Sequence, residues 1–288
     1  MDPIVLLGNI WDNTVGGAWD DLEPFRTQYF DIPQVWDYRH DLLDGFWKTI
    51  LLTMISGVLA LAWGLVLAFL RQLPGKAAAP IRGLTIGYID VFRGIPVILI
   101  MLLVSGSLGA FAVEGFLPRD LGIPRWFGLP DPFWYGVIAL TITYGAYMAE
   151  VYRAGIEAVP SGQMEAARSL GMSHSQAMRQ VIVPQAVNKV VPPLLNDIIA
   201  LMKDTSLVLV LGYTELTQVG RDAQAETFNS SVLVGAGILY LLATIPLARL
   251  VDRLIARQQK RTTRGGGGAT ASPLDVGHAG SIGGRAGT

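Results

Sequence analysis

Five apolar runs, separated by short polar segments, decide what this chain can fold into. They lie near residues 47–70, 84–108, 133–155, 187–211 and 231–250. As a helix rising about 1.5 Å per residue, the first run can cross a hydrocarbon layer of about 30 Å. About half of the chain (51%) is hydrophobic and only 16% is charged, which is typical of integral membrane proteins. The pattern predicts an all-α integral membrane protein, built as a five-span helical bundle.

Basic residues indicate which ends of the spans face the cytoplasm, because cytoplasmic loops are enriched in Lys and Arg. The loop after the first span carries Arg71, Lys76 and Arg82 and no acid. A second basic cluster ends the fifth span: Arg249, Arg253, Arg257, Lys260, Arg261 and Arg264. We therefore expect a multi-pass protein of the cytoplasmic membrane, with the C-terminus inside and the N-terminus outside.

The chain divides into three parts. Residues 1–44 are acidic and carry many aromatic side chains, which predicts an extracytoplasmic arm, either resting among lipid headgroups or solvated. Residues 45–252 hold the five spans. Residues 253–288 are first basic and then Gly-rich, which predicts a cytoplasmic tail with a disordered end.

A polar segment at about residues 156–186 predicts a helix-turn-helix between the third and fourth spans. Pro160-Ser161 can stop one helix and cap another, and Gly171 fits the left-handed residue that ends a helix. Ser173 and Gln176 have the spacing of a capping box for a second short helix. With five spans, this segment lies on the cytoplasmic side.

A spaced motif runs through the same segment. Three residues separate Glu165-Ala166-Ala167 from Gly171, and nine more precede Val181-Ile182-Val183-Pro184. This spacing resembles the cytoplasmic signature of ABC importer permeases, and Pro184 would limit or kink the second helix. In that family the hairpin lies in a groove of the ATPase subunit. The resemblance implies that the coupling residues are Glu165, Ala166, Ala167, Gly171 and Pro184; a solvated or interfacial helix without such a role is the alternative.

Three further segments resemble permeases of polar amino-acid importers. Residues 88–96 (YIDVFRGIP), 144–155 (YGAYMAEVYRAG) and 201–207 (LMKDTSL) resemble that family's ELFRGTP, YGAYLAEIFRGG and LLKDTSL segments. The resemblance makes residues 45–252 a transmembrane permease domain. It implies as partners two ATPase subunits that bind ATP and Mg, a second permease, identical or homologous, and an extracytoplasmic solute-binding protein.

Charged residues within the spans must pair or face a polar cavity, because an isolated charge at mid-helix costs about 2.5–3.5 kcal/mol. Lys203 and Asp204 are adjacent, about 100° apart on a helix, so they cannot satisfy each other. Together with Thr205 and Arg93 they are candidates to line a substrate path. Contacts that stabilise the bundle are the alternative.

Two other pairs of charged residues lie three positions apart, the spacing at which helical side chains meet. They are Asp90 with Arg93 and Glu150 with Arg153. We expect each pair to form an internal ion pair or a contact near the cytoplasmic interface.

Small residues within the spans allow helices to approach closely in membranes. We expect this role, rather than ligand binding, for four glycines: Gly57, Gly64, Gly235 and Gly237.

Several classes of function are not supported by the sequence. The chain has no cysteine, its three histidines are scattered, and no GxxxxGK[ST] phosphate loop, metal-ligand cluster or nucleophile–base constellation occurs. The net charge of −1 gives no indication of nucleic-acid binding. We therefore expect a transport subunit that is not an enzyme and has no catalytic residue, metal or cofactor of its own.

The resemblance implies ATP-driven import of a polar amino acid by alternating access. Glutamate or aspartate is the first candidate, from similarity to acidic amino-acid permeases and from the cations Arg93 and Lys203. Arginine, glutamine and histidine stay open. The alternatives are an ABC permease for another small solute, or a secondary transporter or channel driven by an ion gradient.

Overall fold

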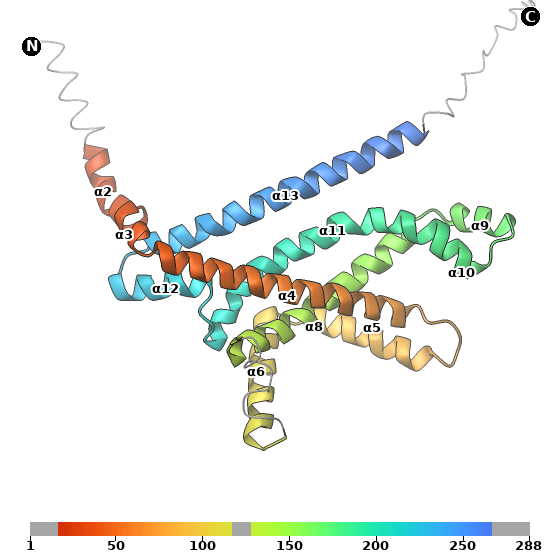
Figure 1. Cartoon of the computed structure of the whole chain (residues 1–288), viewed down its shortest axis with the longest axis horizontal. Helices are drawn as coiled ribbons and strands as arrows, with labels where there is room; N and C mark the ends of the chain where they lie inside the picture. Colours follow the sequence, from red (N-terminus) through yellow and green to blue (C-terminus); the bar gives the residue numbers. More distant parts are fainter. Residues whose placement is uncertain (1–16, 117–127, 267–288) are drawn as a thin grey trace, which may run out of the picture.

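The computed structural model describes residues 17–116 and 128–266, and every regular element in these ranges is helical (Figure 1). The elements are α2 (Gly17–Tyr29), α3 (Ile32–Asp37), α4 (Arg39–Arg71), α5 (Ala79–Gly94), α6 (Val97–Val113), α8 (Asp131–Glu157), α9 (Ser161–Ser169), α10 (His174–Ala177), the π-helical turn η2 (Met178–Ile182), α11 (Val183–Asp204), the 3₁₀ helix η3 (Thr205–Leu211), α12 (Leu216–Thr227) and α13 (Ser231–Gly266).

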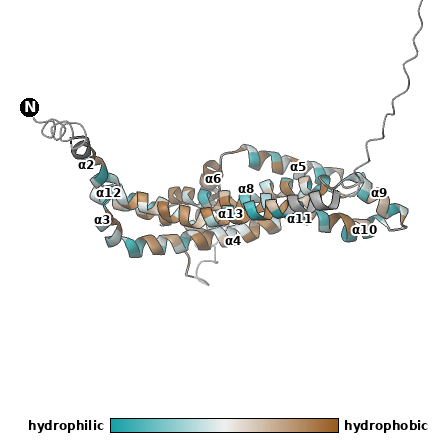
Figure 2. Cartoon of the chain, turned by 90° about the horizontal axis from the view of Figure 1, so that it is seen from above, coloured by the Kyte–Doolittle hydropathy of each residue, from teal (hydrophilic) through white to brown (hydrophobic). Residues whose placement is uncertain are grey.

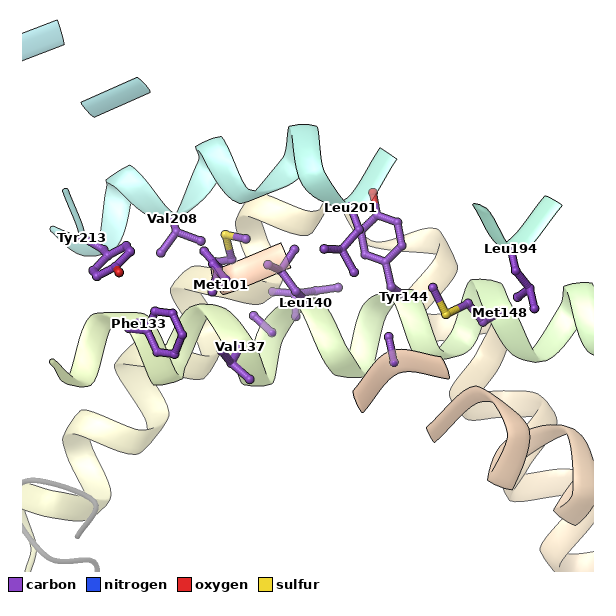
Figure 3. Packing of buried hydrophobic residues seen from close by; sticks show 14 of the residues in the cluster. Met101, Phe133, Val137, Leu140, Tyr144, Met148, Leu194, Leu201, Val208 and Tyr213 are labelled. Carbon is purple, nitrogen blue, oxygen red and sulfur yellow. The ribbon is translucent and has the colours of Figure 1, made fainter. Parts of the chain in front are cut away.

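The core lies where α8 packs against α4 and α11. Figure 3 shows apolar side chains of α8 pointing toward α11, η3 and α6. On α8 these side chains recur every three or four residues, the period of one helix face. The labelled residues of this cluster are Met101, Phe133, Val137, Leu140, Tyr144, Met148, Leu194, Leu201, Val208 and Tyr213.

Glycine allows α4 and α8 to approach closely. A Cβ atom on Gly64 would lie 2.8 Å from the Met148 Cβ and 2.9 Å from the Gly145 oxygen. Gly235 likewise has a close neighbour, since a Cβ atom there would lie 3.1 Å from Val35. The packing prediction is confirmed for these two glycines. It is wrong for Gly57 and Gly237, where an added Cβ would meet nothing within 4 Å.

Replacing Gly64 with valine should therefore destabilise the contact between α4 and α8, because overpacking costs about 1–3 kcal/mol. Gly57→Val is the matched control, since it adds the same side chain to the same helix without a close neighbour. We expect a lower melting temperature for purified Gly64→Val and little change for Gly57→Val. Equal melting temperatures for the two variants would contradict the packing argument.

Two helices in the described ranges are long and apolar enough to cross a membrane: Arg39–Arg71 and Ser231–Arg257. The predicted second span is not one helix. It is divided between α5 (16 residues) and α6 (17 residues), which are long and apolar enough only together and meet at a bend of 110°. Between them Ile95 is extended, and Pro96 has no amide hydrogen to continue the α5 ladder. The count of five spans stays a prediction.

At both ends of the molecule, the helices have other boundaries than the sequence predicted. Figure 1 shows α9 and α10 at one end of the long axis, and α2, α3 and α12 at the other. The first long helix begins at Arg39, inside the predicted arm, and α12 was not predicted. Figure 2 shows hydrophilic residues on α9, α10 and α12, with apolar residues prominent along α4. The predicted basic segment continues α13, whereas most of the predicted disordered tail lies outside the described residues.

Candidate coupling hairpin and intramembrane polar site

The first helix of the hairpin, α9, ends as its sequence predicts. Gly171 has φ +84°, the left-handed conformation that glycine adopts without cost. The Met172 amide donates to the Ala167 carbonyl at 3.2 Å, which satisfies an orphan acceptor of the last turn. The start of α9 differs from the prediction. Pro160 is the N-cap residue, and Ser161 is the first helical residue without a side-chain cap bond.

The second helix begins with the predicted capping box. The Ser173 amide donates to Gln176 Oε1 at 2.8 Å, and the Gln176 amide donates to Ser173 Oγ at 3.2 Å. The sequence analysis expected Pro184 to limit or kink this helix, but the helix continues past Pro184. Pro184 lies in the first turn of α11, directly after the π-helical turn η2. The π-helical turn before it carries the chain directly from α10 into the long α11.

One side of the hairpin packs on the π-helical turn η2, which continues into α11, and its other side is exposed. Ala167 is buried, and the neighbouring small cluster joins Val159, Ile182 and Ala186. Glu165, Ala166, Gly171 and Pro184 are exposed. Leu170, which lies beside the turn, is also exposed, with a relative accessible surface of 84%. A single exposed apolar side chain is common on protein surfaces, but Leu170 adds an apolar residue to this exposed side of the hairpin, and the sequence analysis missed it.

A carboxylate at the hairpin end of α8 joins three helices. Glu150 Oε1 lies 2.7 Å from Arg71 Nη1 of α4 and 3.6 Å from Arg93 Nη1 of α5. Its Oε2 accepts from Arg153 Nε at 2.6 Å, and Arg153 also pairs with Glu157. The predicted pair of Glu150 with Arg153 is confirmed.

The predicted pair of Asp90 with Arg93 is wrong. Among the described residues Asp90 is exposed and has no ion pair, whereas Arg93 turns toward α8. Its guanidinium carbon lies 5.5 Å from the centre of the Tyr147 ring. The more buried Glu150 competes for the same cation, and partial burial strengthens an ion pair. As a result Arg93 helps to hold α5 against α8.

Lys203 and Asp204 point in different directions, as expected for adjacent helical residues. Asp204 Oδ2 accepts from the Tyr144 hydroxyl of α8 at 2.8 Å. Thr205 is fully buried and donates to the Met202 carbonyl at 2.7 Å. Two turns earlier on α11, Asp197 has a buried Oδ2 atom without a hydrogen-bond partner in the described structure. The α11 face toward α8 is therefore acidic.

Lys203 is exposed and lines a hollow on the other side of α11, with a volume of about 300 Å³. Lys203 and Ser206 of η3 form one wall. Thr217 of α12 and Gly237 and Tyr240 of α13 belong to the other. Of the four substrate-path candidates, only Lys203 lines this hollow.

A buried glutamate lies behind this hollow. Glu215 is fully buried and caps α12, with its carboxylate accepting from the amides of Thr217 and Gln218, each at 2.9 Å. Its Oε2 also accepts from the Tyr240 hydroxyl at 3.0 Å, and the Thr49 hydroxyl of α4 lies 3.4 Å away. Burial raises the pKa of Glu215, while these donors favour the carboxylate. The sequence analysis missed this residue because its side-chain partners Tyr240 and Thr49 lie on distant helices.

Comparisons with known proteins agree with this architecture. Residues 60–264 match the family described as "Binding-protein-dependent transport system inner membrane component". The chain is 37% identical over 220 residues to the arginine transport system permease ArgU of Corynebacterium glutamicum, covering 73% of this chain and 67% of the relative. It is 32% identical over 217 residues to the glutamate/aspartate import permease GltK of Escherichia coli, covering 75% and 92%.

A solved structure described as an amino acid ABC transporter with histidines superimposes with a TM-score of 0.66. It has 32% sequence identity and covers 79% of this chain and 98% of the matching chain. The family match spans well over half of the residues. The chain therefore belongs to the inner membrane component family of binding-protein-dependent transport systems, in which its relatives are permeases of amino-acid ABC transporters.

Proposed function

We propose that this chain is the transmembrane subunit of an ATP-driven importer that moves a polar amino acid across the cytoplasmic membrane by alternating access. The hairpin carries this proposal. Its exposed side bears Glu165, Ala166 and Leu170, and its other side packs on η2, the π-helical turn that continues into α11. A partner that pushes on the hairpin would therefore act directly on a helix that lines both intramembrane polar regions.

The proposed assembly contains two ATPase subunits, a second permease and an extracytoplasmic solute-binding protein. ATP and Mg would be bound by the ATPase subunits, and closure of these subunits would drive the hairpins. The N-terminus would lie outside and the C-terminus inside. The placement of the hairpin and the N-terminal arm at opposite ends of the molecule supports this orientation, as does the basic end of α13.

Glutamate or aspartate is the first substrate to test. Lys203 supports it, because an ammonium group beside the Ser206 hydroxyl can bind a carboxylate. Arg93 does not support an acidic substrate, because its guanidinium group already pairs with Glu150. The acidic face of Asp197 and Asp204 favours a second candidate, a basic amino acid such as arginine, whose cation would pair with a buried carboxylate.

Uptake of radiolabelled glutamate by cells that carry the whole transport system tests the function. Deletion of this chain is the control, with unlabelled amino acids as competitors and ATP depleted in parallel. We expect uptake to require both this chain and ATP, and to be competed by glutamate or aspartate. Best competition by arginine would favour the second candidate. Competition only by a solute that is not an amino acid, or uptake driven by an ion gradient without ATP, would refute the proposal.

A further inference from the structure

The helices α2 and α3 expose a row of large apolar side chains. Leu22, Phe25 and Tyr29 are spaced by three and four residues, so they share one face of α2. The Phe25 ring lies 4.8 Å from the Tyr29 ring and 6.0 Å from the Phe30 ring, between ring centres. We call the exposed apolar residues of this segment the arm patch: Leu22, Phe25, Tyr29, Phe30, Ile32 and Trp36.

The turn between α12 and α13 adds another exposed aromatic side chain. Phe228 is 84% exposed. Among the described residues it is the only residue other than glycine with a positive φ, at +53°. The left-handed conformation is unfavourable for a bulky side chain, and exposure to water gives this phenyl ring no apolar contact. Burial of the ring in an apolar environment would offset the strain.

Hydrogen bonds join the arm to this turn. Gln28 Nε2 donates to the Phe228 carbonyl at 2.9 Å, across 200 residues of sequence. Asn229 Nδ2 donates to the Thr27 carbonyl at 2.8 Å, and the Ser230 amide donates to the Gln28 carbonyl at 2.9 Å. The arm patch and Phe228 therefore belong to one structural unit at the start of α13.

The arm patch continues an apolar surface of the first span. The helix α4 is long and apolar enough to cross a membrane. Exposed apolar residues recur along it every three or four positions, as expected for a face in contact with lipid: Leu43, Trp47, Leu51, Met54 and Val58. This face begins close to α3, and Figure 1 shows α2 turned away from the direction of α4 at the same end. A helix with that direction can lie along the membrane surface.

The residue types of the arm fit the headgroup layer of a bilayer. Tyr and Trp are enriched at membrane–water interfaces, and interfacial helices bear Phe and Leu on one face and charged residues on another. On α2 the exposed pair of Glu23 with Arg26 provides the charged side. Acidic residues outnumber basic ones in residues 22–44. We therefore expect apolar burial, rather than attraction to anionic lipids, to hold the arm.

We propose that the arm patch and Phe228 insert together into the phospholipid headgroup layer, at the end of the molecule opposite the hairpin. In this arrangement α2 lies on the membrane surface and anchors the turn between α12 and α13. The arm lies outside residues 60–264, which match the family, so this anchor is an addition to the permease domain. It requires only that α4 crosses a membrane and does not depend on which solute is transported.

The absence of cysteine from the chain allows one labelled cysteine to be introduced at a time. Ile32→Cys and Phe228→Cys would each carry a nitrobenzoxadiazole fluorophore, in the purified complex of permease and ATPase in phosphatidylcholine nanodiscs. Glu23→Cys is the matched control, because Glu23 is exposed on the charged side of the same arm. We expect a lipid with a nitroxide near its headgroup to quench positions 32 and 228 more strongly than aqueous iodide does. Position 23 should show the reverse order.

Removing apolar side chains should release the arm. In the labelled Ile32→Cys chain, the double substitution Phe25→Ser with Phe30→Ser should lower the ratio of inserted to solvated arm by about tenfold or more. Phe111→Ser with Phe116→Ser is the matched control, because these two exposed rings also contact each other but lie at the end of α6. It should leave quenching at position 32 unchanged. Size-exclusion chromatography would confirm that each complex assembles.

Three results would overturn the anchor. Iodide quenching at positions 32 and 228 as strong as at position 23 would mean that the arm is solvated. Protection from both quenchers would mean that protein covers the patch: a second permease if it is seen in the complex alone, or the solute-binding protein if it appears only when that protein is added. Unchanged lipid quenching after loss of Phe25 and Phe30 would show that these rings do not hold the arm.

Discussion

Replacing Gly171 with valine is expected to reduce amino-acid uptake by about tenfold or more while the protein still inserts into the membrane. Gly171 has φ +84°, and a side chain in this conformation costs about 1–2 kcal/mol, more for a β-branched residue. Since 1.4 kcal/mol is about a factor of ten in an equilibrium, the population in which the turn between α9 and α10 is open would rise by about tenfold. The exposed side of the hairpin, on which we propose that an ATPase subunit acts, would then lose its shape.

Gly75 provides the matched control for this prediction. It has φ +87° in the loop between α4 and α5, and a Cβ atom at either glycine would meet nothing within 4 Å. Gly75→Val therefore introduces similar strain outside the hairpin. Uptake and ATPase activity would be measured at equal membrane levels, judged by immunoblot. Wild-type uptake by Gly171→Val, or an equal loss in Gly75→Val, would contradict a specific role of the hairpin in coupling.

Local sequence was sufficient to predict the hairpin. The left-handed glycine and the capping box depend on residues within four positions of one another, and both were found at Gly171 and at Ser173 with Gln176. Pro184 shows where local reasoning stops. A proline can end a helix or begin one, and the π-helical turn before it, which decides between the two, has no distinct sequence signal.

Long-range contacts account for most of what the sequence could not predict. The choice of Arg93 between Asp90 and Glu150 depends on how α5 packs against α8. The burial of Glu215 beside Tyr240 and Thr49 depends on how the start of α12 packs against α13 and α4. Hydropathy located the apolar segments but missed the local break at Ile95-Pro96, where α5 and α6 meet at a bend of 110°. Spacing along one helix identifies possible partners, and tertiary packing selects among them.

Replacing Glu150 with glutamine is expected to give the largest loss of stability among the variants considered. The Glu150 side chain is 17% exposed and contacts the guanidinium groups of Arg71, Arg93 and Arg153. A neutral amide would leave three cations close together without their shared counter-charge. Removing one partner of a largely buried ion pair costs about 3–5 kcal/mol, because the remaining charge keeps its desolvation penalty.

Glu157→Gln is the matched control for that prediction. Glu157 also pairs with Arg153, but its side chain is 61% exposed and has this one ion pair in the described structure. Exposed ion pairs contribute about 0–1 kcal/mol. Thermal unfolding of the purified variants should show a large fall in Tm for Glu150→Gln and a small change for Glu157→Gln. Similar small shifts in both would mean that the three arginines find water or other acceptors when Glu150 is neutral. In that case the ends of α4, α5 and α8 would be held by apolar packing, such as the contact of Gly64 with Met148, and not by the shared carboxylate.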